Sequence, residues 1–288
     1  MKIIETHIVP AIAEKIRLQE YAVSIFKVIS TRSGIKKAIK RGEILLNGKP
    51  ALTSDWIAEG QKIDLLQPKE NNKKIFKLKL EILFEDEDLA IINKPAGIPT
   101  SGNYFKTVEN ALPFNLKIPK NDSALPAPLP VHRLDNPTSG LLICAKTRQA
   151  LNMMQHKFQE REVQKIYLAM VTGKTPEKVI FTDGIEGKCA KTAVERLEIF
   201  SSEDKFFSLL KVYPHTGRTH QIRIHLSQNR FPIVGDKQYG GSNFAKFKGL
   251  FLTAIGLEFN HPVRDKQLKF ELPYPNKFLK LKSLFLTP

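Results

Sequence analysis

The sequence predicts an α+β protein, with a mixed and largely antiparallel sheet, flanking helices and a small N-terminal α/β domain. Apolar residues make up 42% of the 288 residues and charged residues 26%, which is typical of a soluble globular chain. Strand-like segments rarely alternate with single crossover helices, which disfavours a wound parallel sheet. The composition changes near residue 68. We therefore expect a domain over residues 11–67, a linker over 68–79 and a larger domain over 80–288.

The N-terminal domain is expected to contain two helices followed by a short pair of strands. Thr31 suits the N-cap of the second helix and Gly42 its C′ position. One side of this helix is apolar, and the other is cationic. The segment EILLNGKPA contains an Asn-Gly pair that favours a hairpin turn. The cations of the helix are Arg32, Lys36, Lys37, Lys40 and Arg41. Their spacing suits a phosphate backbone, although an ordinary solvated helix surface would have the same pattern.

Residues 68–79, PKENNKKIFKLK, contain five lysines and two asparagines. This composition is typical of a basic linker, which either follows RNA or only separates two domains.

Four segments of the larger domain are expected to be strands. LEILFE (80–85) and DLAIINK (88–94) flank an acidic turn, and IYLAMVTG (166–173) and FFSLLKVY (206–213) follow later in the chain. These segments account for much of the predicted sheet.

Two helices of the larger domain have recognisable starts. Thr147 suits an N-cap, and the helix after it has an apolar stripe that includes Leu151 and Met154. Thr219 suits the N-cap of a later helix in which Ile222 faces inward.

The charge balance favours a polyanionic partner. Lysine and arginine total 45 against 29 aspartates and glutamates, so the formal net charge is +16. A field of this strength promotes association with nucleic acid and makes binding salt-dependent. A basic surface that serves only solubility is the alternative.

The sequence also favours a cytoplasmic location. Cys144 and Cys189 have no metal-binding or disulfide spacing, and we expect both to be buried free thiols in a reducing compartment. The N-terminal segment has no signal-peptide apolar core, and no apolar stretch approaches the roughly 20 residues that span a bilayer.

The segment HRLDNPTSGLL, residues 132–142, places Asp135 beside Arg133 and before a run of turn-forming residues. A surface carboxylate in an ion pair with arginine would have the same local sequence. As a complete string, however, the segment resembles the signature of the RluA-type pseudouridine synthases, which modify uridines in ribosomal RNA.

Further segments carry the same resemblance, in the family's order. They are INKPAGIP (92–99), KIYLAMVTG (165–173) and HTGRTHQIRIHLSQNRFPIVGDKQYG (215–240). The N-terminal domain is similar to the alpha-L RNA-binding motif of a small-subunit ribosomal protein, except that the usual Arg-Leu-Asp opening reads Arg17-Leu18-Gln19. The proline-rich segment before His132 also departs from the family. The resemblance implies the synthase fold, a mixed sheet with helices and loops around a central cleft.

The resemblance also implies catalytic roles. Pseudouridine formation breaks the bond from ribose to a ring nitrogen, rotates the base and joins the sugar to carbon 5, so no cofactor or metal is required. It does require an ionised carboxylate near the anomeric carbon. The family assigns this role to Asp135 and its ion pair to Arg218, with Arg223 as the second choice. Tyr167 would stack on uracil and help to move the proton from carbon 5. A covalent adduct and a glycal path both remain open.

The substrate-binding residues follow in the same way. A stacked uridine must be flipped out before its sugar can be reached, and Arg133 would fill the vacancy. Ile222 would line the pocket opposite Tyr167, and His132 would orient the loop by hydrogen bonding. His215, His220 and His225 recur every five residues, a spacing that does not suit metal ligands.

Two other classes of function stay under consideration. A noncatalytic RNA-binding or ribosome-assembly protein would use charge alone and would not need Asp135, Tyr167 or Arg218. A hydrolase would need a second carboxylate or metal ligands beside the first. We therefore expect a monomeric synthase that acts on RNA, with large-subunit ribosomal RNA as the first expectation and transfer RNA as the second. We expect neither DNA nor a membrane as a partner.

Overall fold

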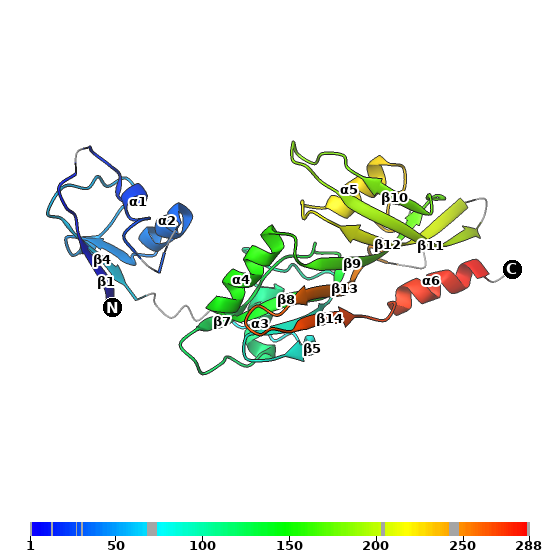
Figure 1. Ribbon diagram of the computed structural model, residues 1–288, viewed down its shortest axis with the longest axis horizontal. Coiled ribbons are helices and arrows are strands. Elements are labelled where there is room, and N and C mark those ends of the chain that lie inside the picture. The colour runs from blue at the N-terminus through cyan, green and yellow to red at the C-terminus, as the bar shows by residue number, and fades with distance from the viewer. Residues whose placement is uncertain are drawn as a thin grey trace. The chain divides into compact units, whose positions relative to one another are not determined.

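The computed structural model describes residues 2–12, 14–26, 28–29, 31–67, 74–202, 205–241 and 248–286. The chain divides into two compact units, residues 1–73 and 74–288, and each has its own sheet and hydrophobic core (Figure 1). Residues 68–73, the first half of the predicted linker, lie outside the described residues.

The smaller unit has a four-stranded antiparallel sheet in the order β1-β4-β2-β3. Its elements are β1 (Ile3–Ile8), α1 (Leu18–Tyr21), α2 (Arg32–Lys40), β2 (Ile44–Leu46), β3 (Lys49–Pro50) and β4 (Lys62–Leu66). β1 precedes the predicted domain start at residue 11. After Ile3 and Ile4, β1 continues with three polar residues in a row, so it has neither an apolar run nor a regular alternation, yet Ile8 pairs with Lys62 of β4.

Helix α2 has the predicted ends. The Thr31 hydroxyl accepts a hydrogen bond from the Gly34 amide, and Gly42 has a φ of 70° just after the C-cap residue. Ile35, Ala38 and Ile39 are buried, which leaves the lysines of the helix facing solvent. The local sequence therefore predicted this helix and its exposed basic side correctly.

The larger unit is built on a ten-stranded sheet with the path β10-β11-β12-β9-β13-β8-β6-β5, with β14 beside β13 and β7 beside β8. Its strands are β5 (Glu81–Glu85), β6 (Leu89–Lys94), β7 (Ala124–Pro130), β8 (Ser139–Thr147), β9 (Gln164–Thr172), β10 (Lys178–Phe181), β11 (Thr192–Ser202), β12 (Lys205–Pro214), β13 (Leu252–Asn260) and β14 (Gln267–Glu271). Its helices are α3 (Val108–Asn115), α4 (Arg148–Gln159), α5 (Gln221–Gln228) and α6 (Asn276–Leu286). Among the described pairings, only β13 with β8 is parallel, which confirms the mixed, largely antiparallel sheet.

The start of α4 is as predicted, but the start of α5 is not. Thr147 accepts a hydrogen bond from the Ala150 amide. The N-cap of α5 is His220, in the left-handed conformation, and not Thr219. The preceding turn is closed by the Gln221 side chain, whose oxygen accepts hydrogen bonds from the Arg218 amide and the Thr216 hydroxyl. Gln221, and not Thr219, therefore makes the side-chain hydrogen bonds that hold the turn before α5.

The main core of the larger unit is formed by strands β8, β9, β12 and β13, and a second cluster packs beneath α3. Cys144 is buried in the second cluster, whereas Cys189 is exposed, so the prediction of two buried thiols is wrong for Cys189. Phe76 and Leu78 pack against the α3 cluster, and the Phe76 amide donates to the Asn110 carbonyl. The second half of the predicted linker thus contacts the larger unit.

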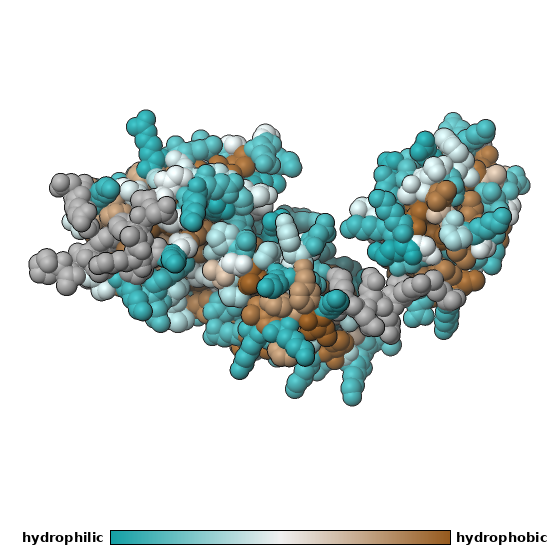
Figure 2. Space-filling model, turned by 180° about the vertical axis from the view of Figure 1, so that it is seen from behind, coloured by the Kyte–Doolittle hydropathy of each residue, from teal (hydrophilic) through white to brown (hydrophobic). Residues whose placement is uncertain are grey.

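The surface is mainly hydrophilic on the face shown in Figure 2, where hydrophobic residues gather in separate patches. No helix in the described part of the chain is both long and apolar enough to span a membrane.

Candidate active site

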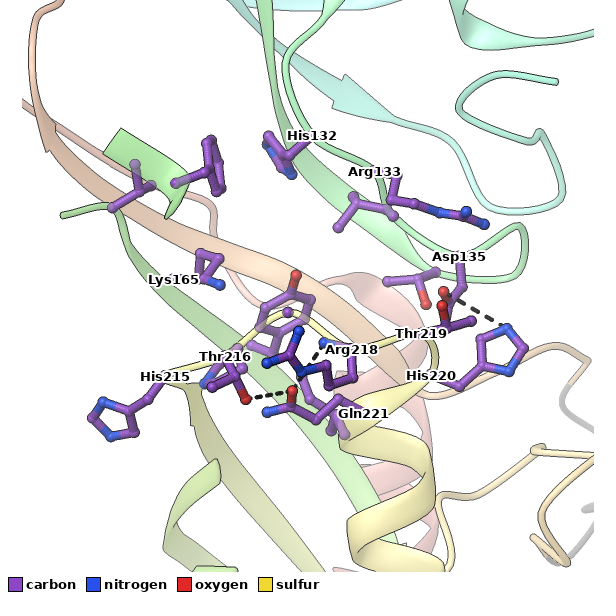
Figure 3. Close-up of a pocket in the computed structure, with 18 of the residues that line it drawn as sticks. His132, Arg133, Asp135, Lys165, His215, Thr216, Arg218, Thr219, His220 and Gln221 are labelled. Carbon is purple, nitrogen blue, oxygen red and sulfur yellow. Dashed lines mark hydrogen bonds and ion pairs between the residues drawn. The ribbon is translucent and has the colours of Figure 1, made fainter. Parts of the chain in front are cut away.

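The larger unit contains a cavity of about 1080 Å³ that brings together all six predicted catalytic and substrate-binding residues (Figure 3). They come from the loop between β7 and β8, from β9, from the turn before α5 and from α5 itself. These six residues are His132, Arg133, Asp135, Tyr167, Arg218 and Ile222. Residues far apart in the sequence therefore share one pocket.

The segment INKPAGIP anchors the loop that carries Asp135 through hydrogen bonds from Lys94. Lys94 is fully buried, and its Nζ donates to the Thr138 carbonyl at 2.8 Å and to the Asn136 carbonyl at 3.3 Å. Burial lowers the pKa of Lys94 to about 8, and the charge of Asp135 opposes this shift. Thr100 also fixes the loop, because its hydroxyl donates to the Leu134 carbonyl and accepts from the Leu134 amide.

The ion-pair partner of Asp135 is Arg223. Its Nη1 lies 3.5 Å from Asp135 Oδ2, whereas no ion pair joins Asp135 to Arg218 in the described part of the chain. The guanidinium is aligned by Asp236, which accepts from Nε at 2.7 Å and from Nη2 at 2.8 Å. Burial alone would raise the pKa of Asp236, but the hydrogen bonds from Arg223 lower it. The expected pairing with Arg218 is therefore corrected to Arg223.

Arg218 is placed differently. Its Nε donates to the Cys189 carbonyl at 3.1 Å, and its backbone amide is bonded to Gln221. These contacts direct the side chain along the pocket wall and away from the carboxylate. Arg218 precedes α5, whereas Arg223 lies within the helix on the side that faces Asp135.

Tyr167 lies on β9 between Val212 of β12 and Ala254 of β13, and it lines the cavity. Burial raises the pKa of its hydroxyl, and the charge of Asp135 raises it further. The hydroxyl therefore stays protonated near neutral pH. Ile222 is buried on α5 and lines the same cavity.

His132 and Arg133 are neighbours with different surroundings. His132 Nε2 accepts a hydrogen bond from the Ile143 amide at 3.1 Å, and its ring lies 4.7 Å from that of Phe158. Burial lowers the pKa of His132 to about 3, helped by the charge of Lys165, so the ring is neutral. Arg133 is exposed, and within the described residues no ion pair joins it to Asp135.

His220 was not predicted as a site residue. Its Nε2 lies 3.8 Å from Asp135 Oδ1, and its Nδ1 is hydrogen-bonded to the Tyr239 hydroxyl at 3.0 Å. Its φ is 56°, which is uncommon outside glycine and is often found at functional sites. The histidine repeat drew attention to this residue, but nothing in that pattern indicated that the turn points it at Asp135.

One group of described residues has the spacing of metal ligands, namely Asp86, Asp88 and His261. His261 Nδ1 accepts hydrogen bonds from the amides of Val263 and Arg264, and Nε2 faces Asp86 at 2.9 Å. Both ring nitrogens are therefore used within the protein. None of the three residues lines the cavity.

The predicted RNA-binding cations of α2 fall into two groups. Arg32 pairs with Glu20 at 2.7 Å, and Arg41 pairs with the buried carboxylate of Glu43 at 2.6 Å. The other three are exposed, and in the described residues no acid pairs with them: Lys36, Lys37 and Lys40. Three of the five predicted cations are thus available to a partner without breaking an ion pair.

Comparisons with known proteins identify the family of this chain. Residues 88–228 match the RNA pseudouridylate synthase family. An uncharacterized RNA pseudouridine synthase of Aquifex aeolicus is 32% identical over 96% of this chain and 96% of its own length. The ribosomal large subunit pseudouridine synthase D of Xylella fastidiosa is 34% identical over 87% of this chain and 83% of its own length. The chain belongs to the RNA pseudouridine synthase family, in its RluA-type branch.

The fold agrees as well. Human RNA Pseudouridylate Synthase Domain Containing 1 superposes with a TM-score of 0.57 at 24% identity, over 73% of this chain and 96% of that one. The family isomerises uridine to pseudouridine in RNA, so the chain is an isomerase.

Proposed function

We propose that this enzyme acts on uridine in large-subunit ribosomal RNA and that Asp135 is the carboxylate that attacks or deprotonates the ribose. The observation that carries the proposal is the position of Asp135, which among the described residues is the single carboxylate lining the cavity and is paired there with Arg223. An ion pair favours the charged form that either role requires. Relatives from Neisseria meningitidis and Xylella fastidiosa are named for the large ribosomal subunit.

The other cavity residues have roles that fit their positions. The cavity is at the upper end of the range for ligand pockets, so it has room for a nucleoside whose base must rotate. The ring of Tyr167 offers a stacking surface, with Ile222 lining the same cavity. Arg133 is exposed at the rim and has no carboxylate partner among the described residues, which suits a side chain that replaces the flipped base.

We also propose that the smaller unit is an RNA-binding module of the alpha-L type and that α2 contacts the phosphate backbone. The exposed lysines of α2 support this proposal. A ribosomal RNA substrate would place the enzyme in the cytoplasm, where we propose that it acts as a monomer without a cofactor.

Release of tritium tests the proposal. Joining the sugar to carbon 5 expels the hydrogen of that carbon, so RNA made with [5-³H]uridine releases tritium into water on isomerisation. We expect purified enzyme to release tritium from large-subunit ribosomal RNA and not from transfer RNA. Release from transfer RNA alone would move the substrate to the second expectation, and formation of free uracil would indicate a hydrolase.

A further inference from the structure

A cluster of cations occupies part of the cavity that the proposed mechanism does not use. Its members come from four separate segments: the end of α4, β9, the approach to β11 and the end of β12. They are the cations Arg161, Lys165 and Lys191 and the neighbouring His215, and we call these four residues the cation cluster. The His215 amide donates to the Lys191 carbonyl at 3.0 Å, which joins two of the segments directly. Figure 3 shows Lys165 and His215 at the left of the cavity and Asp135 with His220 at the right.

The cation cluster has no counter-ion among the described residues. In the described part of the chain, six lysine and arginine side chains line the cavity against one carboxylate, Asp135, which pairs with Arg223. Glu162 is adjacent to Arg161 in the sequence, yet its carboxylate binds Lys157 at 2.8 Å. Lys165 is the partly buried member, and its ammonium lies 5.9 Å from the centre of the Phe158 ring, whereas Arg161, Lys191 and His215 are exposed. A partly buried cation that lacks a carboxylate partner carries a desolvation cost, which a bound anion would offset.

The charges of the cluster also act on His215. Burial lowers the pKa of His215, and the charges of Lys191, Lys165 and Arg161 lower it further. Burial also lowers the pKa of Lys165. His215 is therefore neutral at neutral pH, and the positive charge of the cluster comes from Arg161, Lys165 and Lys191.

The position of Lys165 relates the cluster to the nucleoside. Lys165 and Tyr167 are two residues apart on β9, so their side chains are on the same face, roughly 7 Å apart along the strand. Both line the cavity. A nucleotide whose base rests on Tyr167 would carry its phosphate one sugar away from that ring, within reach of the Lys165 ammonium.

We propose that the cation cluster is a phosphate subsite that binds a phosphate group adjoining the uridine in the cavity. The identity of the nucleoside rests on the proposed function, but the preference for phosphate does not. The phosphate is on either the 5′ or the 3′ side of the nucleoside, and the test distinguishes these two sources. If the phosphates of the RNA backbone were bound only by many surface lysines in general, Lys165 would contribute no more to binding than any other lysine.

The test compares uridine, uridine 5′-monophosphate and uridine 3′-monophosphate as ligands of the full chain, by isothermal titration calorimetry at low ionic strength. We expect one of the two monophosphates to bind at least about tenfold more tightly than uridine, because the added phosphate makes charge-assisted hydrogen bonds. The preferred isomer identifies the side on which the phosphate lies. Equal affinity for all three ligands, including no binding of any up to the solubility limit, would overturn the proposal.

Variants of Lys165 make the test specific. Lys165→Met keeps the aliphatic stem and removes the charge, so the preference for phosphate should fall by about tenfold, whereas Lys165→Arg should retain it. Lys178→Met is the matched control, because it removes the same charge from an exposed position on β10 outside the cavity. If Lys178→Met reduced the preference as much as Lys165→Met, the effect would be general electrostatics, and the subsite would be disproved.

A second variant and a kinetic measurement distinguish the possible outcomes of the test. If Lys165→Met does not fold, Lys191→Met tests the same cluster from an exposed position. With substrate RNA, Lys165→Met should raise KM about tenfold and leave kcat within threefold, because the phosphate contact is the same before and during the reaction. A protein that prefers the monophosphate but releases no tritium would refute the proposed function and leave the phosphate subsite intact.

Discussion

The basic side of α2 and the cation cluster of the cavity carry the same kinds of charge in opposite surroundings. Lys36, Lys37 and Lys40 are exposed on one helix, whereas the cluster is assembled from four segments around a partly buried lysine. Exposed cations remain hydrated, so each one contributes a modest, salt-sensitive attraction. A cation that is already partly desolvated gains more from a well-placed anion. We therefore expect α2 to provide affinity for RNA in general and the cavity to select the position of one nucleotide.

The largest expected effect separates chemistry from binding. Asp135→Asn should reduce tritium release on the order of 10⁴-fold, because an amide is neither a nucleophile nor a base at the sugar. RNA affinity should stay within a few-fold of wild type, since α2 and the cation cluster are unchanged. Asp122→Asn, at an exposed position outside the cavity, is the control and should retain full activity. Near-normal turnover by Asp135→Asn would remove this residue from the mechanism.

The second effect distinguishes the two arginines of the site. Arg223→Gln removes the partner of the buried Asp236 and should cost about 3–5 kcal/mol of folding stability. Arg218→Gln loses one hydrogen bond to a carbonyl and should cost about 1 kcal/mol. Calorimetric unfolding of the two variants measures the difference. Equal losses for both variants would contradict the pairing of Arg223 with Asp135 and Asp236.

The third effect concerns α2. Replacing Lys36, Lys37 and Lys40 together with alanine should weaken RNA binding and lower the slope of log affinity against log salt by about 2 to 3. The catalytic constant at saturating RNA should not change. A triple variant of Lys174, Lys178 and Lys266, which are exposed on the larger unit, removes the same charge. An equal drop in slope for this control would mean that α2 has no special role.

The smallest effect is a pH dependence of stability. Burial lowers the pKa of His132 from 6.5 to about 3, so the unfolded chain takes up a proton at a pH where the folded chain does not. Stability from this group is complete above about pH 6.5 and is lost as the pH falls toward 3, with roughly 1 kcal/mol lost by pH 5.5. His132→Gln should flatten this part of the profile, whereas His156→Gln, at an exposed position, should not. Identical profiles for His132→Gln and wild type would show that His132 is not the group responsible.

Much of the fold could be predicted from local sequence. Helices α2 and α4 start at Thr31 and Thr147 because a hydroxyl before an amphipathic run is a strong capping signal. Strands β5 and β6 were recognisable from apolar runs on either side of an acidic turn. β1 was missed because three consecutive polar residues, 5–7, interrupt its isoleucines, and its place in the sheet depends on long-range pairing with β4.

The candidate site could likewise be predicted only in part. The signature strings predicted which residues share the cavity, but they did not predict which arginine faces Asp135. That choice depends on the turn before α5, where Gln221 ties down Arg218 and His220 adopts a left-handed conformation. The phosphate subsite could not be predicted either, because Arg161, Lys165, Lys191 and His215 come together only when four separate segments pack.

The central claim is that Asp135 isomerises a uridine in large-subunit ribosomal RNA, and mapping of RNA from cells tests it most directly. Carbodiimide modification followed by primer extension would be applied to RNA from cells that lack the gene and from the same cells supplied with wild type or Asp135→Asn. We expect at least one pseudouridine stop in large-subunit RNA to be absent from cells that lack the gene, to return with the wild-type gene and to stay absent with Asp135→Asn. Restoration of the stop by Asp135→Asn, or a large-subunit map that is identical in all strains, would contradict it.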